Sequence, residues 1–140
     1  MPDKFKAGAR QRLPDRRRSE ARRIVWQPPH NPDALETRIF VTIGFGEDGL
    51  RPVEIFYDGG YRAGSELEAL VKELCIVLSV IIQHEDVEIA RLAHSLGREQ
   101  SLRSDREDFI SLVGVLIGEL LKPPMWSDAL MALKKEGDKG

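Results

Sequence analysis

The chain has 140 residues, of which 41% are hydrophobic and 31% are charged, so it suits one domain with flexible ends. No apolar run approaches the roughly 20 residues of a membrane-spanning helix, and the charged N-terminus lacks the apolar stretch of a secretory signal. We therefore expect no membrane association and a cytoplasmic location, with a bacterial-type cytosol as the default. The single cysteine, Cys75, excludes an intrachain disulfide and a multi-thiolate metal site.

The net charge of −2 conceals a basic N-terminal segment. Residues 1–23 contain nine Lys and Arg residues and three acids, so they carry +6 while the remainder carries −8. Few of them are apolar, which predicts a disordered arm. Such an arm suits a polyanion or an acidic protein surface. Its candidate contacts are Arg16, Arg17, Arg18, Arg22 and Arg23. We favour a solvated tail slightly over a nucleic-acid site, because no aromatic side chain is interleaved with the arginines to stack on bases.

After this arm, three prolines between Trp26 and Pro32 indicate a stiff connector, so residues 1–35 are assigned to arm and connector. Residues 36–45 and 52–58 alternate in hydrophobicity and flank an Asp-Gly turn, a pattern typical of a β-hairpin. The inward residues of the hairpin are predicted to be Ile39, Val41, Ile43, Phe45, Val53, Ile55 and Tyr57. Because a lone hairpin is marginal, we expect helices to cover it, residues 22–26 to extend it, or another chain to complete it.

Helical patterns follow the hairpin. A capping box at Ser65 to Glu68 opens a helix that runs to about Gln83, with Leu67, Leu70, Val71, Leu74, Cys75, Leu78 and Ile81 on its main apolar stripe. Its second half is apolar nearly all round, which is typical of a helix central to a core or at a subunit interface.

Further helices are expected at about 86–96, 105–121 and 127–135, and Gly114 and Gly118 are spaced to permit close approach of another helix. The third of these begins at a second capping box, Ser104 to Glu107. The predicted class is α+β, an antiparallel hairpin packed on about three helices. The domain spans residues 36–122 and the C-terminal tail spans 123–140.

One local feature suggests ligand binding. Glycines precede the helix at Ser65, where free amides favour an anion, and Arg62 adds a positive charge. Arg62, Gly64 and Ser65 are therefore a candidate anion or nucleotide site, although a capped turn explains the glycines equally and we favour it. No catalytic motif includes His30, His84 or His94, and Cys75 lies on an apolar helix face where burial makes a thiol inert. We predict no catalytic residue and no metal site.

The hairpin residues Phe40-Val41-Thr42-Ile43 and Glu47-Asp48-Gly49-Leu50-Arg51-Pro52-Val53-Glu54-Ile55-Phe56, followed by Gly64-Ser65, resemble the TSCPD domain family. The upstream Leu13-Pro14-Asp15-Arg16-Arg17-Arg18 is similar to the basic segment that precedes this domain in adenosylcobalamin-dependent ribonucleotide reductases. The resemblance covers roughly residues 13–121. The Cys-containing signature that names the family is missing, and the nearest counterpart, residues 124–129, keeps at most the Asp.

The resemblance implies a role in deoxyribonucleotide synthesis, but ribonucleotide reduction needs a radical-carrying cysteine and a reducing cysteine pair on a large barrel. One cysteine in 140 residues cannot supply three. We therefore expect an accessory module that works with a separate catalytic chain, which would hold the adenosylcobalamin; no cofactor is expected here. Two alternatives remain open: a nucleic-acid adaptor that uses the basic arm, and a homo-oligomeric structural module.

Overall fold

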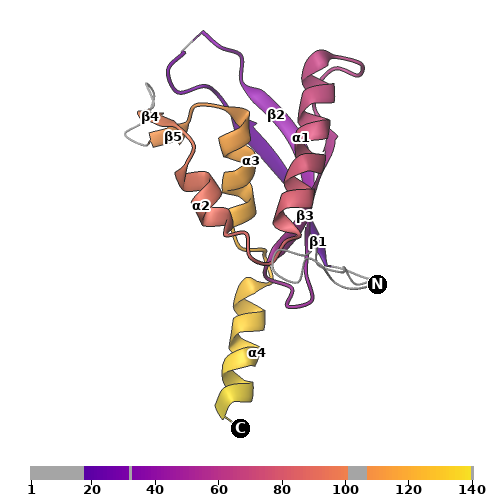
Figure 1. Ribbon diagram of the computed structural model, residues 1–140, viewed down its shortest axis with the longest axis vertical. Helices are drawn as coiled ribbons and strands as arrows, with labels where there is room; N and C mark the ends of the chain where they lie inside the picture. The colour runs from indigo at the N-terminus through magenta and orange to yellow at the C-terminus, as the bar shows by residue number, and fades with distance from the viewer. Residues whose placement is uncertain (1–17, 32, 101–106, 140) are drawn as a thin grey trace.

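The computed structural model describes residues 18–31, 33–100 and 107–139. Helices cover one face of a three-stranded antiparallel sheet whose strand order is β1-β2-β3 (Figure 1). This arrangement confirms the predicted α+β class. A separate two-stranded ribbon, β4-β5, lies beyond α2. The elements are β1 Ser19–Trp26, β2 Thr37–Phe45, β3 Pro52–Gly59, α1 Glu66–Ile82, α2 Ile89–His94, β4 Arg98–Gln100, β5 Glu107–Phe109, α3 Leu112–Leu121 and α4 Ser127–Lys139.

The predicted hairpin is confirmed as β2 and β3, which pair antiparallel. Every residue predicted to face inward is buried, apart from Tyr57, which is partly buried. The third strand, β1, comes from the segment that we assigned to the arm and connector. It pairs with β2 from Ser19↔Gly44 to Trp26↔Thr37, so residues 19–23 form sheet in place of a disordered arm. Residues 1–17 lie outside the described part of the chain.

Helix α1 has the predicted bounds, but its buried stripe is narrower than predicted. Val71, Cys75, Leu78 and Ile82 are buried, whereas Leu67 is 55% and Leu70 is 64% exposed. The cause is the position of α1 beside β3. The Ser79 hydroxyl accepts from Ile55 N–H and donates to Ile55 C=O, each at 2.9 Å. The helix therefore turns a serine toward the sheet and leaves several apolar side chains facing out.

The predicted helix 105–121 is wrong in its first half, because residues 107–109 form β5 and α3 begins only at Leu112. The second capping box largely lies outside the described residues. Gly114 and Gly118 do not admit another helix as predicted. They make room for the Phe109 ring, since a Cβ on Gly114 would overlap the ring and a Cβ on Gly118 would lie 2.9 Å from Phe109 Cε2.

Candidate functional site

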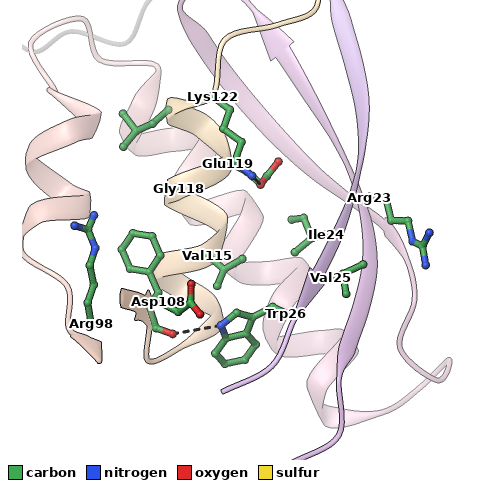
Figure 2. Close-up of a pocket in the computed structure, with 12 residues that line it drawn as sticks. Arg23, Ile24, Val25, Trp26, Arg98, Asp108, Val115, Gly118, Glu119 and Lys122 are labelled. Carbon is green, nitrogen blue, oxygen red and sulfur yellow. Dashed lines mark hydrogen bonds and ion pairs between the residues drawn. The ribbon is translucent and has the colours of Figure 1, made fainter. Parts of the chain in front are cut away.

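An open groove of about 650 Å³ lies between the outer edge of β1 and helix α3 (Figure 2). Trp26 Nε1 donates to the Phe109 carbonyl at 3.3 Å and joins β1 to the ribbon at one end of the groove. Apolar and charged groups both line it. Its lining includes Arg23, Ile24, Val25, Val115, Leu121 and Lys122.

Strand β1 borders this groove with backbone groups that face away from the sheet. Phe45 N–H donates to Arg18 C=O at 2.9 Å, which shows that Arg18 is in a hydrogen-bonded pair. Because such pairs alternate along an antiparallel ladder, the N–H and C=O groups of Arg23 and Val25 point outward. Within the described ranges, β1 is an edge strand and no backbone segment pairs with its outer side.

Arg22 fixes the position of α3 relative to β1. Its guanidinium donates to the carbonyl of Glu119 and to that of Lys122, the latter at 2.9 Å, and its Nε lies 2.7 Å from Glu20 Oε1. The other carboxylate oxygen of Glu20 accepts from Met125 N–H at 2.7 Å. Burial raises the pKa of Glu20, but the Met125 and Arg22 hydrogen bonds outweigh burial, so the net pKa is below its ordinary value. These hydrogen bonds hold the end of α3 beside β1 and thereby determine how far apart the two sides of the groove lie.

The arginines predicted to bind a polyanion have different surroundings. Arg22 is engaged within the fold, and the Arg18 guanidinium lies 5.9 Å from the centre of the Trp126 ring. Arg23 is exposed, and its side chain points away from α3 (Figure 2). Arg16 and Arg17 lie outside the described residues. Only one of the three described arginines therefore presents its charge to solvent without a contact inside the fold.

The residues between β2 and β3 form the hairpin turn and connect the hairpin to α1 through hydrogen bonds. Asp48 Oδ1 accepts from the N–H groups of Leu50 at 2.9 Å and Arg51 at 3.0 Å, and Gly49 has φ +70°. The Arg51 guanidinium donates to three carbonyls at and beyond the C-terminal end of α1, Ile82 at 2.6 Å, His84 at 3.0 Å and Val87 at 3.1 Å. A cation there also complements the helix dipole. Arg51 belongs to the segment that carries the family resemblance, but its contact with the end of α1 was not predicted from the sequence.

The residues of the predicted anion site belong to a helix cap made by the protein's own side chains. Ser65 Oγ accepts from Glu68 N–H at 3.2 Å, and Glu68 Oε1 accepts from Gly64 N–H at 3.0 Å. A negative charge from Glu68 thus lies at the helix start where an external anion would sit, and Glu66 adds a second. Arg62 lies two residues before Gly64 in the chain, and its side chain is exposed. The arrangement functions as a helix cap.

Cys75 is 1% exposed, and burial, followed by the charge of Asp58, raises its pKa to about 11. The thiol is therefore protonated at neutral pH and shielded from reagents. His30 Nδ1 lies 3.5 Å from Glu99 Oε2 and is half exposed, so this pair joins the connector to β4. In the described residues, no group of three His, Cys, Asp or Glu side chains is arranged to hold a metal ion.

No family model, curated protein or solved structure matches the chain. Among the described helices, none combines the length and the apolar character that crossing a membrane requires.

The groove itself was not predicted from the sequence, because β1 and α3 are separated by more than eighty residues in the chain. The only signal was the expectation that residues 22–26 extend the hairpin. The arrangement offers backbone hydrogen-bonding groups, an apolar wall and several charges. These groups suit the binding of an extended chain segment.

Proposed function

We propose that this chain is an accessory module of ribonucleotide reduction, which acts by association with a separate catalytic chain. The observation that carries the proposal is the structural role of the residues that resemble the TSCPD motif. Asp48 and Gly49 form the hairpin turn, Arg51 ties the hairpin to α1, and Ser65 caps that helix. Asp48, Gly49, Arg51 and Ser65 therefore serve as structural residues in this chain, which is what an accessory module requires of them.

The state of the single cysteine supports the same proposal. The chemistry implied by the resemblance needs three cysteines, one to carry a radical and two to supply electrons. This chain has Cys75 alone, buried and with its pKa raised to about 11 by burial. The radical step and the adenosylcobalamin would therefore belong to the catalytic chain.

The test is sedimentation velocity of the purified chain mixed at micromolar concentration with the large ribonucleotide reductase chain of the same organism. The expected result is a faster species that contains both chains. A folded acidic protein of similar size, in place of this chain, controls for nonspecific association. Separate sedimentation of the two chains would overturn the proposal. DNA binding that weakens steeply with salt, without binding to the reductase, would favour the nucleic-acid adaptor in its place.

A further inference from the structure

We propose that the groove between β1 and α3 binds an extended acidic segment of a partner protein, which adds a fourth strand to the sheet along β1. The inference deepens the proposed function, on which it rests for taking another protein as the partner. The groove would be the surface that binds this partner protein.

The backbone supplies the first part of the argument. Arg23 and Val25 each direct one N–H and one C=O away from β2, and both residues line the groove. The pairing of β1 with β2 has no bulge from Ser19 to Trp26, and β1 contains no proline to block a further strand. An extended peptide could therefore form up to four main-chain hydrogen bonds at these two residues, the mode known as β-strand addition.

The groove walls supply side-chain selectivity. Ile24 faces the core side of the sheet, and Val115 of α3 lies across the groove from it (Figure 2). Leu121 of α3 also lines the groove. Leu121 is 43% exposed. Because successive side chains of a strand point to opposite faces, every second residue of the added strand would contact this apolar wall. The remaining residues would lie on the outer face of the sheet, level with Arg23 and Val25.

The charges favour an acidic segment. The groove lining contains three cations, Arg23, Arg98 and Lys122, and two acids, Asp108 and Glu119, so its net charge is +1. Lys122 and Glu119 neutralise each other, since Lys122 Nζ lies 2.6 Å from Glu119 Oε2, and Arg23 is left exposed. A second copy of this chain, pairing β1 with β1, would bring arginine-rich strands together, and like charges across strands are destabilising. A strand that alternates apolar and acidic residues avoids this repulsion and pairs with Arg23.

The test begins with a random heptapeptide library displayed on phage and selected against the purified full chain. Enriched peptides are expected to alternate apolar and acidic residues. Their synthetic forms are then titrated against two matched pairs of variants, with folding checked by circular dichroism. Val25→Pro removes one outward N–H, and Val25→Thr keeps it. Arg23→Glu reverses a charge at the groove, and Arg62→Glu reverses one outside it.

We expect Val25→Pro to weaken binding about tenfold, because the peptide loses a main-chain hydrogen bond and keeps an unpaired carbonyl. Arg23→Glu should weaken it about fivefold, whereas Val25→Thr and Arg62→Glu should bind as the wild type does. Failure of the library to enrich any peptide, or binding unchanged in both groove variants, would overturn the inference. A dimer of the free chain that Val25→Pro dissociates would assign the edge to a second copy and also overturn it.

The groove assignment and the proposed function can be refuted separately. Peptide binding in the groove together with no association with the reductase chain would refute the proposed function and leave the groove assignment intact. Association with the reductase that is unchanged in Val25→Pro and Arg23→Glu, with no peptide selected, would refute the groove assignment alone.

Discussion

Replacing Arg51 by alanine tests how the hairpin is joined to α1. The guanidinium donates to the carbonyls of Ile82, His84 and Val87, where the end of α1 meets the turn toward α2. Each hydrogen bond from a charged donor contributes about 1.5–3 kcal/mol when fully shielded. Arg51 is only partly buried, so water replaces some of each bond in the variant. We expect the free energy of unfolding to fall by about 2–4 kcal/mol.

Urea unfolding followed by circular dichroism measures this loss. Arg51→Lys separates charge from geometry, because an ammonium group keeps the charge but lacks the planar fork that reaches several carbonyls. It should recover about half of the stability lost in Arg51→Ala. The matched control is Arg38→Ala, which removes an exposed arginine paired with Glu36 and should change stability by less than about 0.5 kcal/mol. If Arg51→Ala unfolds at the same urea concentration as the wild type, the hydrogen bonds of Arg51 to the end of α1 do not stabilise the fold, and the prediction is refuted.

Two further predictions concern the core. Gly114→Ala should destabilise the fold by about 1–3 kcal/mol, because its Cβ overlaps the Phe109 ring. In the double variant, Phe109→Leu should recover part of that loss. If the two losses are additive in urea unfolding, the assigned contact between Gly114 and Phe109 is contradicted. Burial raises the pKa of Cys75 to about 11 from an ordinary 9.0, so the folded state keeps the thiol proton longer than the unfolded state does. The stability that the protonated thiol contributes is fully present below pH 9.0 and is lost as the pH rises toward 11. Unfolding measured at a series of pH values should show this decline in the wild type, and Cys75→Val should reduce it. An equal decline in both proteins would contradict the prediction.

The hairpin and α1 could be predicted from the sequence because local rules determine them. Alternation identified the buried faces of β2 and β3, and Ser65 begins α1 as its capping box indicates. The exposure of Leu67 and Leu70 could not be predicted by the same means. It follows from the hydrogen bonds between Ser79 and Ile55, a long-range contact that overrides the apparent apolar stripe.

The groove and the short α3 have similar explanations. A helical pattern through residue 109 was outweighed by pairing between β4 and β5 and by the fit of the Phe109 ring against two glycines. Charge composition located the arginine-rich segment, but it could not predict that residues 19–23 join the sheet, nor distinguish Arg22, engaged with the end of α3, from exposed Arg23. That distinction depends on strand register, which pairing with β2 determines.

The most direct measurement of the central claim is deoxyribonucleotide formation by the large reductase chain alone, with this chain, and with its Cys75→Ala variant. We expect no product from this chain by itself, and we expect the wild type and the variant to change the reductase rate equally, because the buried thiol takes no part. Product formed by this chain alone, or loss of its effect in a variant that remains folded and bound, would contradict an accessory role.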